Sequence, residues 1–348
     1  MTISRADTTR PANPTAQPHP SALGYTMLMR PADLADNLFG RDRAALRALG
    51  AHDVAGRPLE QLDDEARRAL AQTDVLIMGW GAPHLGDEDL DAAPRLRAIL
   101  YAGGQVSGLL PASIHHRGIL LSNAGHANAI PVAEFTAALI TLANKETLRS
   151  ARLYRERRTM IHREIDFPRA GNRAKTVGIV GASRIGRMVI ERLSALEIDI
   201  ALSDPFVGPA EARTLGVRLV GLDELMATSD VVSVHAPLNH DTVGLITRAH
   251  LRAMRDGATF INTARGLLVD QDALLDELRT GRIDAMLDVT TPDVLPAQHE
   301  LYDLPNVLLT PHMAGSTGPE LRRLGDHVAD EFERVARRLP LLFPETTR

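Results

Sequence analysis

The sequence contains no cysteine among its 348 residues. Disulfide bonds, thiolate nucleophiles and cysteine-ligated zinc are therefore excluded. Lysine is nearly absent as well, since the 39 basic residues include only two lysines, Lys145 and Lys175. Few side chains are thus available to form a Schiff base with a substrate.

Long hydrophobic runs are also missing. No apolar run approaches the roughly 18 residues that a membrane-spanning helix needs, and the first residues lack the hydrophobic segment of a secretory signal. The net charge of −5 argues against a nucleic acid or an anionic membrane as a partner. Residues 1–22 are rich in proline and are predicted to form a disordered tail. The default expectation is a cytoplasmic enzyme or binding protein.

Short apolar runs alternate with helical patterns along the rest of the chain, which is typical of α/β domains with parallel sheets. In the first part the predicted strands lie within residues 73–80, 95–104 and 118–124, and helices are predicted at 42–50 and 64–72. The alternation restarts at Thr176, and there the predicted strands lie within residues 176–180, 199–204, 231–237, 258–266, 283–289 and 306–312. A boundary near residue 125 therefore separates two α/β bodies.

Two helices have clear end signals. Pro131 precedes a long helical pattern through residue 158, and proline is favoured in the first turn of a helix, so the helix is predicted to begin there. Gly281 follows the helical pattern 270–281 and is predicted to end that helix.

A glycine-containing turn joins the predicted strand 176–180 to a helix. Gly181 and Gly186 bracket the turn GASRIG, and Asp204 ends the next strand. Strand, glycine turn, helix and later acidic residue together indicate a dinucleotide site, with the pyrophosphate on backbone N–H groups at the helix N-terminus. The alternative is a purely structural turn.

Ser183 stands where the middle glycine of this motif is expected. If the site demands a left-handed backbone, serine costs about 1–2 kcal/mol there. Its hydroxyl could instead donate a hydrogen bond to a phosphate oxygen. Asp204 can accept hydrogen bonds from an adenosine ribose and would repel a 2′-phosphate, which predicts NAD as the cofactor. The alternative for Asp204 is a solvated aspartate at a strand end.

Polar residues follow several predicted strands. Because the carboxyl ends of parallel strands share one edge of a sheet, these side chains are expected to meet in one crevice: His235, Arg265, Asp288 and His312. The Arg265 guanidinium suits a substrate carboxylate. His235 is expected to frame the nicotinamide or ribose pocket, with a second acid as the alternative.

His312 needs a carboxylate partner to work as an acid near neutral pH. Asp293 is the favoured partner, and Asp288 and Glu300 compete with it. His115 and His116 are adjacent and lack the spacing of a metal pair, so no metal site is predicted.

Several segments together resemble the D-isomer-specific 2-hydroxyacid dehydrogenase family: TVGIVGASRIG (176–186), HAPL (235–238), INTARGLLVD (261–270), LDV (287–289) and TPHMAG (310–315). The resemblance implies an α/β fold of two doubly wound parallel-sheet domains, in which a Rossmann NAD domain is inserted in a flavodoxin-like substrate domain. It places the substrate-binding domain at residues 23–124 and 316–348 and the NAD-binding Rossmann domain at 125–315. Closure of the two bodies around residues 124–130 and 311–317 is expected.

The resemblance also assigns roles to residues. It implies Arg265, Asp293 and His312 as catalytic residues, with Asp293 replacing the usual glutamate. It implies a substrate site at Ala102, Gly103, Gly104 and Arg265, and Trp80 either lines that site or fills core. The implied cofactor-binding residues are Gly181, Ser183, Arg184, Ile185, Asp204, His235, Pro237, Thr242, Thr263, Ala264, Asp288, His312 and Gly315.

The implied activity is the interconversion of a 2-keto acid and a D-2-hydroxy acid by hydride exchange with NAD, in a homodimer. An NAD-sensing co-regulator of the same fold with little turnover is the alternative, and a formate dehydrogenase fits less well. The common motifs do not specify the side chain of the substrate.

Overall fold

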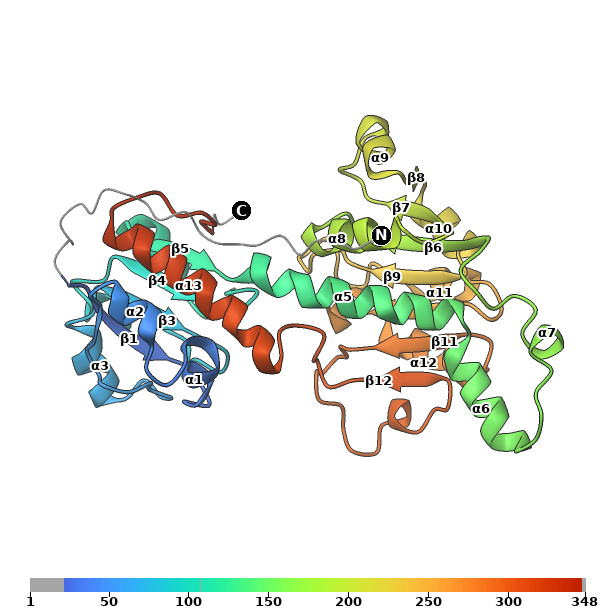
Figure 1. The fold of residues 1–348 in the computed structure, drawn as a ribbon, viewed down its shortest axis with the longest axis horizontal. Coiled ribbons are helices and arrows are strands. Elements are labelled where there is room, and N and C mark those ends of the chain that lie inside the picture. The colour runs from blue at the N-terminus through green and yellow to red at the C-terminus, as the bar shows by residue number, and fades with distance from the viewer. Residues whose placement is uncertain (1–21, 107, 346–348) are drawn as a thin grey trace, which may run out of the picture. The chain divides into compact units, whose positions relative to one another are not determined.

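The computed structural model describes residues 22–106 and 108–345, which form two compact units. One unit comprises the described residues up to Ala124 together with those from Leu321 onward, and the other comprises Gly125–Glu320 (Figure 1). The predicted tail lies outside the described residues except for Ala22.

The first unit contains a five-stranded parallel sheet in the order β2-β1-β3-β4-β5, which is the flavodoxin-like order. Its strands are β1 (Gly24–Leu28), β2 (His52–Asp53), β3 (Val75–Met78), β4 (Ala98–Tyr101) and β5 (Leu120–Asn123). Its helices are α1 (Leu34–Phe39), α2 (Ala44–Ala48), α3 (Asp64–Leu70), α4 (Asp87–Asp91), the 3₁₀ helix η1 (Ala112–Arg117) and α13 (Leu321–Ala336). Every residue of β1, β3 and β4 is buried, as expected for a parallel sheet covered on both faces.

Helix α13 completes this unit from the far end of the sequence. A side chain at Gly325 would place its Cβ 1.9 Å from the carbonyl oxygen of Leu38, so the close packing of α13 on α1 requires glycine. Phe332 is fully buried and meets the ring of Tyr25 edge-on at 6.1 Å between centroids. The buried Glu331 carboxylate accepts hydrogen bonds from Ser122 Oγ and from the backbone N–H groups of Leu342 and Phe343.

The second unit contains a seven-stranded parallel sheet in the order β12-β11-β10-β9-β6-β7-β8. Its strands are β6 (Lys175–Val180), β7 (Ile198–Ser203), β8 (Arg218–Leu219), β9 (Val231–Val234), β10 (Thr259–Asn262), β11 (Asp284–Leu287) and β12 (Val307–Leu309). Numbered from β6, this is the Rossmann order 3-2-1-4-5-6 with a seventh strand added. The predicted fold is thereby confirmed.

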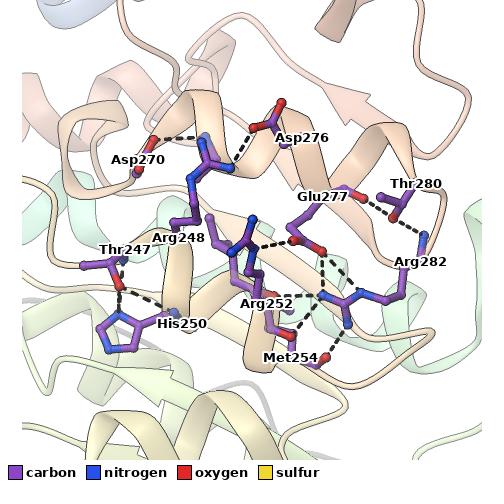
Figure 2. Close-up of polar contacts among 12 residues, drawn as sticks. Thr247, Arg248, His250, Arg252, Met254, Asp270, Asp276, Glu277, Thr280 and Arg282 are labelled. Atoms are coloured by element: carbon purple, nitrogen blue, oxygen red, sulfur yellow. Dashed lines mark hydrogen bonds and ion pairs between the residues drawn. The ribbon is translucent and has the colours of Figure 1, made fainter.

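Helices and 3₁₀ turns connect these strands: α5 (Gly125–Asn144), α6 (Thr147–Arg157), α7 (Arg163–Asp166), α8 (Arg184–Leu193), α9 (Pro209–Leu215), α10 (Leu222–Thr228), α11 (Arg248–Ala253), η2 (Gly266–Leu268), α12 (Gln271–Arg279), η3 (Glu300–Tyr302) and η4 (Gly318–Glu320). Polar contacts join α11 to α12, among them the ion pair of Arg248 with Asp276 at 2.7 Å (Figure 2). Arg282 beyond α12 adds an ion pair with Glu277, also at 2.7 Å.

The prediction that the long helix begins at Pro131 is wrong. Helix α5 begins at Gly125, and Pro131 lies inside it. Proline removes its own N–H from the helix and its ring crowds the carbonyl four residues earlier, and burial of Pro131 together with Ala127, Val132 and Leu139 offsets part of this cost. The helical pattern is also interrupted, because Glu146 adopts a left-handed backbone with φ of 50° before α6 begins.

The return to the first unit lies between Glu320 and Leu321, whereas the sequence analysis placed it at residue 316. The intervening residues stay with the second unit because Ser316 N–H donates to Asn128 Oδ1 at 2.9 Å, at the start of α5. No helix among the described residues is long and apolar enough to cross a membrane.

Candidate active site

The strand order of the second unit reverses between β6 and β9, so the loops after these two strands flank the position where ligands bind in such sheets. Gly181 follows β6 with φ of +97°, a conformation that L side chains rarely adopt. A Cβ at Gly181 would lie 2.6 Å from Ala236 N in the loop after β9. Glycine is therefore required where the two loops meet.

The turn after Gly181 leads directly into α8. A Cβ at Gly186 would lie 2.2 Å from Gly181 O, so the helix can pack this close to the strand only with glycine there. Ser183 has an extended backbone (φ −60°, ψ 175°), and the expected strain of a left-handed serine does not arise. Its hydroxyl accepts a hydrogen bond from Gly186 N–H at 3.3 Å and caps the helix. Arg184 and Ile185 form the first turn, where free N–H groups suit a phosphate.

Asp204 lies just after β7 and faces this turn. Its Oδ2 accepts the N–H of Ala182 at 2.7 Å, and its Oδ1 accepts the N–H of Phe206 at 2.8 Å. The carboxylate therefore fixes the glycine turn, and each oxygen keeps a second lone pair for a ribose hydroxyl. The Phe206 side chain is 91% exposed.

His235 lies at the end of β9 and is buried. Its Nε2 is hydrogen-bonded to Ser233 Oγ at 2.8 Å, and its Nδ1 has no hydrogen-bond partner among the described residues. Burial lowers the pKa of His235 to about 4, so the ring is neutral near pH 7. A neutral ring of this kind is poorly suited to be a second acid.

The loop after β9 and the end of the β12 loop carry three further predicted cofactor residues. Thr242 Oγ1 donates to Pro237 O at 2.6 Å, which closes the exposed turn between these two residues. Gly315 packs against Asn128 of α5, where a Cβ would lie 3.0 Å from Oδ1.

The turn after β10 presents Arg265. The side chain of Asn262 holds this turn, since its Oδ1 accepts the N–H of Ala264 at 3.0 Å and its Nδ2 donates to Arg265 O at 2.9 Å. Thr263 Oγ1 is hydrogen-bonded to Thr136 Oγ1 of α5 at 2.7 Å. Arg265 is half-buried, and its Nη1 donates to Ala264 O at 2.7 Å.

Asp288 follows β11 and braces the loop after β12. Its Oδ1 accepts hydrogen bonds from Thr310 Oγ1 at 2.6 Å and Met313 N–H at 2.8 Å, and its Oδ2 accepts Ala314 N–H at 2.9 Å. Its backbone carbonyl also accepts the N–H of His312. Asp288 is 1% exposed, and its buried carboxylate is hydrogen-bonded to the loop that carries His312.

The structure places Asp293 beside His312. His312 has φ of +54°, and its Nδ1 lies 3.2 Å from Asp293 Oδ2. The two competing carboxylates are engaged elsewhere: Asp288 holds the loop backbone, and Glu300 pairs with Arg279 at 2.6 Å. Asp293 therefore reaches the imidazole even though it is one methylene shorter than glutamate. A carboxylate in this position orients the ring.

Trp80 and the loop Ala102–Gly104 lie at the carboxyl edge of the sheet in the first unit. Arg30 N–H donates to Trp80 O at 2.9 Å, which ties the loop after β3 to the loop after β1. A Cβ at Gly103 would lie 2.9 Å from Trp80 Nε1 and 2.5 Å from the ring of Tyr101. Trp80 is half-buried, and Ala102 is buried.

The other polar clusters of the described residues do not form a second candidate site. No group of three or more His, Asp or Glu among them is arranged to hold a metal ion. A cavity of about 360 Å³ lies at the opposite, amino-terminal edge of the second sheet, beside Thr259 and Asp284. Its arginines already have partners, for example Arg152 with Asp284 at 3.0 Å and Arg282 with Asp256 at 3.3 Å.

Several residues whose side chains fix the loops of the candidate site were not predicted from the sequence. Asn262, Gln271, Thr290 and Thr136 were not singled out, although each contacts a loop that carries a predicted site residue. Asn262 could have been found as the polar residue that ends an apolar strand. Gln271 and Thr136 lie in ordinary helical patterns and give no such signal.

Comparisons with known proteins fit this geometry. The model of the NAD-binding domain of D-isomer specific 2-hydroxyacid dehydrogenases matches residues 137–314. The D-3-phosphoglycerate dehydrogenase of Archaeoglobus fulgidus is 34% identical over 259 residues, which cover 73% of this chain and 48% of that protein. The chain thus spans about half the length of the curated relatives it matches.

Two solved structures are similar over most of the chain. The TT0316 protein from Thermus thermophilus has a TM-score of 0.76 and 28% identity, covering 93% of this chain and 100% of that one. The NAD-dependent formate dehydrogenase from Staphylococcus aureus, solved with NAD, has a TM-score of 0.69 and 27% identity, covering 91% and 96%.

Proposed function

Because the chain belongs to the D-isomer specific 2-hydroxyacid dehydrogenase family, with NAD as its cofactor, we propose that it interconverts a 2-keto acid and a D-2-hydroxy acid. The observation that carries this proposal is the contact of His312 Nδ1 with Asp293 Oδ2 at 3.2 Å. A histidine oriented by a carboxylate is suited to exchange a proton with an oxygen that becomes a hydroxyl.

The residues of the second unit have separate roles in this proposal. His312 donates a proton to the carbonyl oxygen of the keto acid, and Asp293 orients the ring. Arg265 binds the substrate carboxylate and stabilises negative charge on the carbonyl oxygen. In the reverse direction His312 accepts the proton. NAD, when bound, supplies or accepts the hydride.

The residues present fit a dinucleotide. Gly181 and Gly186 allow the close turn, the first turn of α8 leaves backbone N–H groups free for the pyrophosphate, and Asp204 keeps lone pairs for a ribose hydroxyl. Nδ1 of His235, which has no hydrogen-bond partner among the described residues, is one further buried polar atom on the loop that meets Gly181.

Two observations bear on the class of substrate. Curated relatives are named D-3-phosphoglycerate dehydrogenase, and one similar structure is a formate dehydrogenase. The carboxylate beside His312 favours proton exchange, which formate oxidation does not need. We therefore favour a 2-hydroxy acid, and Trp80, Ala102, Gly103 and Gly104 of the first unit stay predicted substrate-binding residues. The homodimer and the cytoplasmic location also stay predictions.

The decisive test is reduction of a panel of 2-keto acids, from glyoxylate, pyruvate and hydroxypyruvate to the keto acid of D-3-phosphoglycerate and bulkier acids. It is run with NADH and NADPH in parallel. We expect NADH-dependent turnover that is nearly abolished in Arg265→Ala and His312→Ala. Tight NADH binding without turnover on any acid would favour an NAD-sensing co-regulator. Wild-type rates in His312→Ala would contradict the acid assignment.

A further inference from the structure

The pair of His312 and Asp293 is open to solvent, with side chains 45% and 60% exposed. An exposed pair of this kind gains little from its own attraction, because water screens it and both side chains are free to move. The short distance therefore depends on how the two loops are held. Asp288 holds the histidine loop through three hydrogen bonds.

The aspartate loop is held by a different side chain. Gln271, the first residue of α12, accepts the N–H of Thr291 at its Oε1 and donates from its Nε2 to the carbonyl of the same residue, both at 2.8 Å. One side-chain amide thus satisfies both backbone groups of a residue two positions before Asp293. The paired bonds fix the position and the orientation of that peptide segment.

Two further contacts keep the same loop in place. Thr290 Oγ1 donates to Pro292 O at 2.7 Å and to Asp293 O at 3.1 Å. A Cβ at Gly266 would lie 2.3 Å from the Thr290 carbonyl group, so the aspartate loop packs directly on the residue that follows Arg265. The loops of Arg265 and Asp293 are therefore in direct contact.

We propose that Gln271 is a positioning residue, whose amide holds the Thr291 backbone and thereby keeps the Asp293 carboxylate within reach of His312. This inference rests on the proposed function only for its kinetic consequence. The charged side chains on the loops around this pair are Asp293, Asp288 and Arg265. The Asp288 carboxylate accepts hydrogen bonds from residues 310–314, and Arg265 lies on the neighbouring loop.

The variant Gln271→Met keeps the length of the side chain and removes both hydrogen bonds. We expect kcat to fall about tenfold while KM changes less than about twofold, because misplacement of a proton-transfer pair costs rate rather than binding. Gln271→Glu keeps the oxygen that accepts Thr291 N–H and is expected to lose less. Asp276→Asn on the same helix removes the ion pairs of this side chain with Arg248 (Figure 2) and Arg279, and it serves as the matched control with unchanged kcat.

A double variant of Gln271 and Asp293 distinguishes a positioning role of Gln271 from a general loss of structure. If Gln271 acts through Asp293, adding Gln271→Met to Asp293→Asn causes no further loss of kcat. Losses that multiply, so that the double variant is about tenfold slower than Asp293→Asn, would overturn the proposal.

A second readout needs no turnover. The ring signals of His312, identified among the 13 histidines by their loss in His312→Asn, are followed by NMR in the labelled full chain. We expect Gln271→Met to shift them in the same direction as Asp293→Asn, with no shift in Asp276→Asn. Unmoved His312 signals in Gln271→Met would refute the inference even in a chain without dehydrogenase activity, and a shift without turnover would refute only the proposed function.

Discussion

The buried Asp288 offers the clearest test of how the candidate site is held together. In Asp288→Asn the shape of the side chain is kept, but one acceptor oxygen becomes an NH₂ group. The two carboxylate oxygens accept three hydrogen bonds from residues 310–314. The amide cannot satisfy all three donors, so at least one backbone N–H faces another donor.

The cost follows from these contacts. A buried donor without an acceptor costs about 1–3 kcal/mol, and the remaining hydrogen bonds weaken because the acceptor is no longer charged. Relief of the buried charge offsets part of this loss. We therefore expect the second unit to lose about 2 kcal/mol, which lowers its unfolding temperature by about 4–8 °C for a domain of this size.

Calorimetry of the full chain measures this change, and hydrogen exchange of the peptide that contains residues 310–315 locates it. The control is Glu224→Gln, which removes only the exposed ion pair of Arg218 with Glu224 and should change the unfolding temperature by less than about 1 °C. An unchanged unfolding temperature together with unchanged protection of residues 310–315 in Asp288→Asn would show that this carboxylate does not hold the histidine loop.

Three further predictions concern the cofactor side of the sheet. Gly186→Ala places a Cβ 2.2 Å from Gly181 O, so we expect it to cost about 1–3 kcal/mol and to abolish NADH binding in a fluorescence titration; wild-type affinity would contradict the packing argument. Asp204→Ala should narrow the preference for NADH over NADPH, measured as the ratio of kcat/KM values, and an unchanged ratio would remove Asp204 from cofactor selection. The lowered pKa of His235, about 4, means that the unfolded chain binds a proton below about pH 6.5 whereas the folded chain does not. The free energy of unfolding therefore keeps this contribution above that pH and loses about 3 kcal/mol as the pH drops to 4. We expect His235→Phe to flatten the pH dependence of the unfolding temperature. The same pH dependence in the variant and the wild type would count against a buried neutral ring.

The sequence was most informative at positions where the local structure accepts few residue types. The strands followed from apolar runs, and the glycine turn followed from Gly181 and Gly186, because a tight turn against a neighbouring loop tolerates no Cβ. The family and its doubly wound fold followed from the resemblance of several motif segments, among them residues 176–186 and 310–315. Charge predicted a carboxylate partner for His312 but left Asp288 and Glu300 as alternatives, and the family resemblance placed that partner at Asp293, which lies 3.2 Å from the imidazole.

The sequence was least informative about side chains that hold loops. Gln271 and Thr291 are 20 residues apart, and no periodicity links the first residue of a helix to a loop after the next strand. Ser183 was expected to strain the turn or contact phosphate, but it caps α8 in an extended conformation. Pro131 was placed at the start of its helix because a propensity rule describes helix ends and not the burial that allows an exception.

The insertion of one unit within the other has a consequence for synthesis on the ribosome. Translation completes residues 125–320 before the segment that forms α13 is made, so the Rossmann unit can fold while the flavodoxin-like sheet still lacks this helix. During that interval the faces of Tyr25 and Leu38 that meet α13 are uncovered. Ser122 must then find Glu331 across 209 residues of chain, and because contacts distant in sequence form slowly, we expect the first unit to complete its fold last.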